Sequence, residues 1–129
     1  MNFDFSDDQK MLKEQVRKFL ADKCPMTVTR RVLEKEEAYA EEVWKGLVEM
    51  GLTGTAIPEE FGGLGLGKES MCVVSEELSR GYIGVGSLGT RSEIAAELIL
   101  GGGTAEQKQK WLPKIASGEV LPTAVFTEP

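Results

Sequence analysis

Four glutamates stand in pairs whose spacing could bring carboxylates together. Glu76 and Glu77 are adjacent, and Glu93 and Glu97 are four residues apart, which places them on one face of a helix. Paired carboxylates can bind metal in helical bundles, but the four-carboxylate di-iron pattern also needs histidine, and the chain contains none. We therefore expect these glutamates to be solvated side chains and predict no metal site.

A glycine-rich stretch from Gly62 to Lys68 has the spacing of a phosphate-binding loop, G-x-x-x-x-G-K. The next residue is Glu69, where a Ser or Thr would hold the metal ion. Pro58 and the two acidic residues after it stand where a buried strand should precede such a loop. A nucleotide triphosphate site is one alternative, and a tight glycine turn is the interpretation that these residues favour.

Arg91 lies between Thr90 and Ser92, where we expect a helix to begin. A cation near the start of a helix opposes the helix dipole, so Arg91 should have a partner. A surface salt bridge, to Glu93 or to another carboxylate, is the simplest such partner.

Composition excludes several classes of function. The net charge is −6, from 15 Lys and Arg against 21 Asp and Glu, which argues against a nucleic-acid partner and a polybasic membrane anchor. No apolar run approaches the roughly 20 residues of a membrane span. The absence of histidine removes Ser-His-Asp and Cys-His catalysis. Cys24 and Cys72 are expected to be free thiols, and with no predicted secretory or mitochondrial leader we expect a cytoplasmic protein.

Hydrophobic periodicity and capping signals predict five or six helices. The pattern S-D-D-Q at Ser6 and T-A-E-Q at Thr104 are capping boxes, and Gly51 should end a helix as its C′ residue. The expected helices cover residues 7–21, 25–33, 43–50, a stretch from Lys68 through Leu78, 84–100, and a stretch from Thr104 through Leu112.

Two glycine-rich regions separate these helices. Residues 52–67 contain Pro58 and five glycines, so we expect a long loop of the kind that often carries function. The helix over 84–100 is expected to be broken or delayed near Gly89 and to stop at the three glycines from Gly101.

The fold class predicted is all-α: an up-down bundle of five or six helices with an extended C-terminal tail. The tail, VLPTAVFTEP, contains the strand formers Val125 and Phe126, and a lone strand has nothing in a helical domain to pair with. We therefore expect a helical domain over residues 1–119 and the start of a β domain over residues 120–129.

Four segments in this order and spacing resemble the N-terminal region of flavin-dependent acyl-CoA dehydrogenases. They are FSDDQKMLKEQVRKFL, GLTGTAIPEEFGGLGLG, GGGTAEQKQKWLPKIASGE and the terminal AVFTEP. The resemblance implies the first of three domains in an enzyme that desaturates acyl-CoA thioesters with FAD. It implies no catalytic residue in this chain, since the base lies in the C-terminal domain, and it places Phe126 and Thr127 against the flavin.

The same resemblance places Thr90, Arg91 and Ile94 beside the acyl tail of the substrate. Arginine at position 91 departs from the family, in which His or Gln is usual. An arginine in a hydrocarbon pocket is costly unless an anion meets it, so we expect an acyl group with a second carboxylate, such as a glutaryl- or methylsuccinyl-like thioester.

The resemblance further implies that the full-length protein, hereafter the parent, is a homo-oligomer that passes electrons to an electron-transfer acceptor. The chain alone should neither retain FAD nor catalyse the reaction, because a helical domain cannot by itself hold a flavin. The alternatives are a stand-alone helical module for protein interaction and a non-catalytic relative that keeps the fold without the chemistry.

Overall fold

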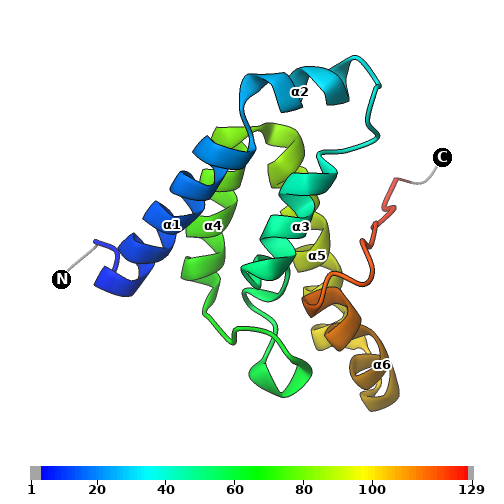
Figure 1. Ribbon diagram of the computed structural model, residues 1–129. Helices are drawn as coiled ribbons and strands as arrows, with labels where there is room; N and C mark the ends of the chain where they lie inside the picture. The colour runs from blue at the N-terminus through cyan, green and yellow to red at the C-terminus, as the bar shows by residue number, and fades with distance from the viewer. Residues whose placement is uncertain (1–3, 128–129) are drawn as a thin grey trace.

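The computed structural model describes residues 4–127, and all regular structure within that range is helical (Figure 1). This confirms the predicted all-α class. The elements in chain order are α1 (Asp7–Lys23), α2 (Met26–Leu33), α3 (Glu41–Glu49), the single 3₁₀ turns η1 (Leu52–Gly54) and η2 (Glu59–Phe61), α4 (Lys68–Gly81), α5 (Ile83–Gly102) and α6 (Ala105–Ala116).

The predicted capping signals are present. The hydroxyls of Ser6 and Thr104 accept hydrogen bonds from the backbone N–H three residues on, and the glutamine at each of those positions bonds back to the cap. Gly51 has a φ of 72°, a left-handed conformation that glycine adopts without steric cost, and it follows the end of α3 as expected. Local sequence therefore sets where α1, α3 and α6 begin or end.

Helices α4 and α5 form a tight hairpin around a single extended residue, Tyr82. The expected break near Gly89 is wrong, because α5 is continuous through that glycine. A Cβ at Gly89 would lie 2.8 Å from Leu78 Cδ1, and one at Gly86 would overlap Ser79. These glycines allow the two helices to approach closely, and the packing outweighs the low helix propensity of glycine.

The buried apolar side chains form two clusters. The larger one lies among α1, α3, α4 and the first half of α5, and includes Val16, Trp44 and Leu78. The smaller one joins the second half of α5 to α6 and to the segment before α4, and includes Phe61 and Leu112. Both α5 and the segment between α3 and α4 contribute to the two clusters, so they connect the halves of the molecule (Figure 1).

The long loop predicted over 52–67 is ordered by its own backbone. The N–H groups of Leu64, Gly65 and Leu66 donate to carbonyls of Gly54, Ile57 and Thr55 at 2.9 Å each. These bonds fold residues 62–67, hereafter the glycine loop, back over residues 53–57, hereafter the threonine turn. The segment is irregular, as expected, but it is packed rather than open.

The tail leaves α6 after Gly118 and runs along the molecule in an extended conformation (Figure 1). No strand forms between residues 120 and 127, which agrees with the absence of a pairing partner in this domain. Val125 and Phe126 are 84% and 68% exposed. Glu128 and Pro129, the end of the motif quoted above, lie outside the described residues.

Candidate functional site

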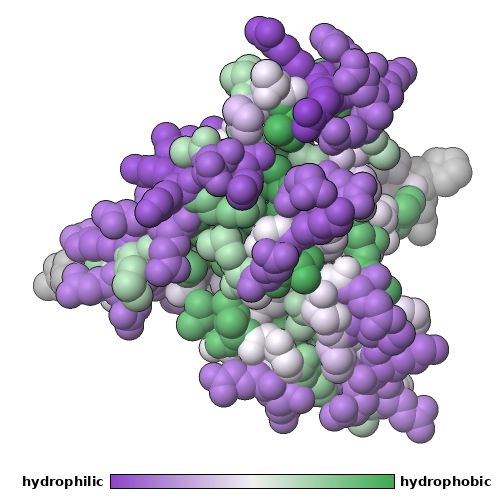
Figure 2. Space-filling model, in the orientation of Figure 1, coloured by the Kyte–Doolittle hydropathy of each residue, from purple (hydrophilic) through white to green (hydrophobic). Residues whose placement is uncertain are grey.

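The outer side of α5 presents residues at helical spacing that no other element covers. Ile83, Ser87, Arg91, Ile94 and Leu98 are all exposed, and they recur every three or four residues. Three of them are large apolar side chains. Figure 2 shows hydrophilic residues over much of one face of the molecule, with apolar ones between them. Because the exposed stripe on α5 is mostly apolar, it is a candidate contact surface.

Part of this stripe forms a shallow groove of about 300 Å³. The groove contains all three predicted substrate-contacting residues, Thr90, Arg91 and Ile94, together with Ser79, Ile83, Gly86 and Ser87. The hydroxyl of Thr90 donates to the Gly86 carbonyl oxygen at 2.9 Å. The structure thus brings the three residues together.

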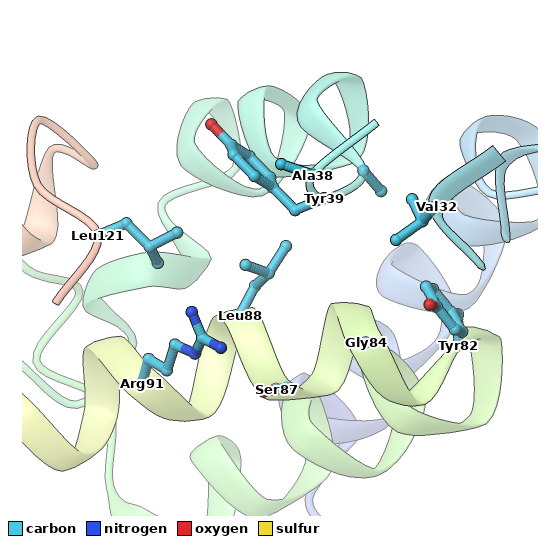
Figure 3. A pocket seen from close by; sticks show the side chains of 10 residues that line it. Val32, Ala38, Tyr39, Tyr82, Gly84, Ser87, Leu88, Arg91 and Leu121 are labelled. Atoms are coloured by element: carbon cyan, nitrogen blue, oxygen red, sulfur yellow. The ribbon is translucent and has the colours of Figure 1, made fainter. Parts of the chain in front are cut away.

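A second hollow, of about 380 Å³, lies on the other side of Arg91. Its wall comes from α2, the segment just before α3, the junction between α4 and α5, α5 itself and the tail. The lining residues are Val32, Ala38, Tyr39, Ala40, Tyr82, Gly84, Ser87, Leu88, Arg91 and Leu121. Figure 3 shows the guanidinium of Arg91 between Leu88 and Leu121. No local sequence pattern marks Tyr39, Tyr82 or Leu121 as lining residues, because they come from a charged run, a helix junction and the tail.

Arg91 does not lie at a helix N-terminus, so that expectation is wrong. It lies nine positions from Tyr82, in the interior of α5, where the end of the helix dipole has little effect. The expected salt bridge to Glu93 is also absent, and no other described carboxylate pairs with Arg91. Its guanidinium is a cation without a described partner, placed between two hollows with largely apolar linings.

Two of the four paired glutamates are partly or fully withdrawn from solvent, contrary to expectation. The Glu77 side chain is fully enclosed and accepts hydrogen bonds from Arg17 at 2.7 and 3.0 Å and from Arg80 at 3.0 Å. These hydrogen bonds lower the pKa of Glu77 to about 2, and those from Arg17 have the largest effect. Glu93 is half-buried, and burial raises its pKa to about 7.

The other two glutamates form ion pairs with lysines. Glu76 bonds to Lys13 and Glu97 to Lys68, each at 3.0 Å. Within residues 4–127, no group of three His, Cys, Asp or Glu side chains is placed to hold a metal ion.

The glycine loop does not present a phosphate cradle. The backbone N–H groups of all five residues from Gly62 to Leu66 are bonded to carbonyl oxygens of this chain. Gly62 and Gly65 have φ values of 82° and 62°, which the tight turn requires. The turn is thus the interpretation that the structure supports, and these amides are not available to an anion.

The described helices include none that is both long enough and apolar enough to cross a bilayer. Cys24 and Cys72 are free, as expected, with Cys24 buried and Cys72 exposed.

The two predicted flavin-contacting residues, Phe126 and Thr127, are exposed in the tail and lie outside both hollows.

Residues 6–119 match a family described as the N-terminal domain of acyl-CoA dehydrogenases. The chain belongs to this family. The match covers every helix of the fold and ends where the tail begins. The resemblance identified from the sequence motifs is therefore confirmed.

The acyl-CoA dehydrogenase relatives are much longer than this chain. The (2S)-methylsuccinyl-CoA dehydrogenase of Cereibacter sphaeroides is 61% identical over 123 residues, which are 95% of this chain and 22% of that protein. The mitochondrial isovaleryl-CoA dehydrogenase of Arabidopsis thaliana is 38% identical over 97% of this chain and 31% of its own length.

A solved acyl-CoA dehydrogenase supports the same fold. The Bacillus anthracis enzyme complexed with FAD has a TM-score of 0.80 and 33% identity, over 92% of this chain and 20% of that chain. The present chain thus spans about a fifth to a third of the relatives it matches.

Proposed function

We propose that this chain is the N-terminal helical domain of an FAD-dependent acyl-CoA dehydrogenase, and that the outer face of α5 forms one wall of its acyl pocket. Residues 1–119 are the helical domain, and residues 120–129 lead into a middle β domain. The parent removes hydrogen from the α and β carbons of an acyl-CoA thioester. The family match over residues 6–119 and the relatives' names support this proposal.

The preferred substrate is a dicarboxylic acyl-CoA, and Arg91 binds its second carboxylate. The supporting observation is a guanidinium with no described acidic partner beside a groove lined by Thr90 and Ile94. Desolvating a cation is costly unless an anion compensates it, and arginine and carboxylate form strong paired hydrogen bonds. The relative at 61% identity is named for a dicarboxylic substrate of this kind, methylsuccinyl-CoA.

FAD, when bound, supplies the hydride acceptor of the reaction. Phe126 and Thr127 are the residues of this chain that could contact FAD, because they lie in an extended, exposed segment that forms no strand. Two tail residues offer only one edge of a flavin site. The remainder belongs to the parent, and the 129-residue chain neither retains FAD nor catalyses the reaction.

In the parent we further propose a homo-oligomer that passes electrons to an electron-transfer acceptor in the cytoplasm. A reading frame that continues past Pro129 into a flavin-binding segment and a second helical domain is the simplest check. A protein that ends at Pro129, or a purified 129-residue chain that holds FAD stoichiometrically, would favour an interaction module or a non-catalytic relative.

The decisive experiment is Arg91→Gln in the full-length parent. Losing a charge-assisted bond to a desolvated carboxylate costs about 2–3 kcal/mol, or roughly 30- to 150-fold in kcat/KM. We expect that loss with a dicarboxylic acyl-CoA and a much smaller one with a plain acyl-CoA of equal length. Arg30→Gln, at an exposed position on α2, is the matched control. Equal losses with both substrates would show that Arg91 is structural only.

A further inference from the structure

Glu93 lies where three parts of the fold meet, on the inner side of α5. Its Oε2 accepts a hydrogen bond from the Ser75 hydroxyl of α4 at 3.3 Å. It also borders a small cavity whose opposite wall is the threonine turn. The cavity holds about 10 Å³, which is close to the least that one water molecule needs. Glu93 is half-buried, and on the cavity side an ionised carboxylate has room for at most one water molecule unless the wall moves.

No described cation compensates a charge on Glu93. The threonine turn contributes only Thr53, Thr55, Ala56 and Ile57 to the cavity wall, and none of them is titratable. On α5, Glu97 is a like charge that adds to the effect of burial, and the ammonium of Lys68 at the start of α4 is bonded to Glu97. The Ser75 hydroxyl is the one group that favours ionisation. Burial is the largest influence, and the pKa of Glu93 is about 7.

The cavity wall is connected to the glycine loop. Carbonyls of Gly54, Thr55 and Ile57 in and around the turn accept the hydrogen bonds that fasten Leu64, Gly65 and Leu66. Thr53 in turn donates to the Ala116 carbonyl oxygen at the end of α6. A movement of the threonine turn away from α5 therefore disturbs the anchoring of the glycine loop.

We propose that Glu93 is a protonation-dependent latch. Its neutral carboxyl allows the threonine turn, with the glycine loop attached, to pack against α4 and α5, and its ionisation loosens both. This latch lies on the inner face of α5 and does not depend on the acyl pocket proposed for the outer face.

The direction of the pH effect follows from linkage. The folded pKa is raised above the ordinary glutamate value, so the packed state holds the proton more tightly than the open state does. The packed state is therefore fully favoured at a pH below the ordinary value of about 4.3. Its advantage is lost as pH rises toward 7, and no further loss occurs above that pH.

Amide hydrogen exchange on the 129-residue chain tests the latch directly. The reporters are the N–H groups of Leu64, Gly65 and Leu66, corrected for intrinsic exchange between pH 5 and 8.5. We expect their opening equilibrium to rise by up to about tenfold per pH unit and to level off near pH 7. Glu93→Gln, which keeps the shape of the neutral carboxyl, should remove this rise.

Two further variants separate a latch from a merely structural residue, with the Glu93 side-chain carboxyl titrated by NMR. Ser75→Ala removes the group that favours ionisation and should move the midpoint to higher pH. Glu97→Gln removes the like charge and should move it to lower pH. A Glu93 that titrates near 4.3 overturns the proposal. So does a glycine loop whose exchange has the same pH profile in the native chain and in Glu93→Gln.

Discussion

Glu77 illustrates how one enclosed side chain can determine the acid stability of a domain. Its carboxylate on α4 is held by Arg17 of α1 and by Arg80 of its own helix. The sequence shows only an adjacent glutamate pair, and nothing in its spacing distinguishes Glu77 from Glu76. The distinction arises because Glu77 shares a face of α4 with buried Val73 and Val74, whereas Glu76 points to solvent.

We predict that acid destabilises the chain through Glu77. The folded pKa of about 2 lies below the unfolded value, so the stabilisation is complete above about pH 4.5 and is lost as pH falls toward 2. Glu77→Gln should lower the free energy of unfolding at pH 7 by about 2–3 kcal/mol, since it removes charge-assisted bonds to an enclosed group. Urea titrations followed by circular dichroism at several pH values measure both effects.

The adjacent Glu76→Gln is the matched control for that experiment. Glu76 is exposed and pairs with Lys13 at the surface, so this change should cost less than about 1 kcal/mol. A similar loss in the two variants would mean that enclosure of Glu77 does not matter.

At the level of the elements, the end of α2 carries a local strain. Lys35 has a φ of 61°, and it is the one described residue other than glycine with a positive φ. That conformation costs an L-residue about 1–2 kcal/mol, which exceeds the entropy that glycine loses on folding. We predict that Lys35→Gly raises the free energy of unfolding by about 0.5–1 kcal/mol. Lys35→Ala removes the charge but keeps the Cβ, so it should bring no such gain in urea denaturation.

Two glycines with opposite surroundings test the packing of the segment between α3 and α4. A Cβ at Gly63 would overlap the Ile57 carbonyl oxygen, whereas one at Gly101 in α5 would meet nothing within 4 Å. Gly63→Ala should therefore destabilise the chain by about 1–3 kcal/mol. Gly101→Ala should stabilise it by about 0.5–1 kcal/mol, because alanine favours the helix. Thermal unfolding of the two variants should show melting temperatures shifted in opposite directions.

The elements also show where sequence patterns succeed and fail. Capping residues and the C′ glycine of α3 act through bonds within a few positions, so the sequence alone predicts those boundaries. The continuity of α5 through Gly89 depends on α4, which lies against it, and no local signal reveals that contact. The hollow around Arg91 likewise needs Tyr39 and Leu121, which are far apart in the chain and meet only in the fold.

At the scale of the whole molecule, several apolar groups are exposed outside the core. They include Ile83 and Leu98 on α5 and Val125 and Phe126 in the tail. A surface stripe of this kind and an extended segment with unpaired backbone groups both favour association. We predict that the 129-residue chain is helical and self-associates, with light scattering that gives a mass increasing with concentration.

Removing residues 120–129 tests the part played by the tail. The shortened chain should associate less if the tail is exchanged between copies, and Phe126→Ser should act in the same direction. A monodisperse monomer at high concentration, with the tail ordered against its own domain, would contradict this prediction.

The two hydrophobic clusters have a consequence for how the chain comes apart. The smaller cluster around Leu112 is connected to the larger one through α5 and the segment before α4. Because its buried residues nevertheless form a separate cluster, we expect it to melt as a cooperative unit of its own while α1, α3 and α4 stay intact. A protease applied to the native chain should cut first around α6 and leave a resistant N-terminal fragment. The end of the domain that adjoins the tail would thus be able to change conformation while the part built from α1, α3 and α4 keeps its structure.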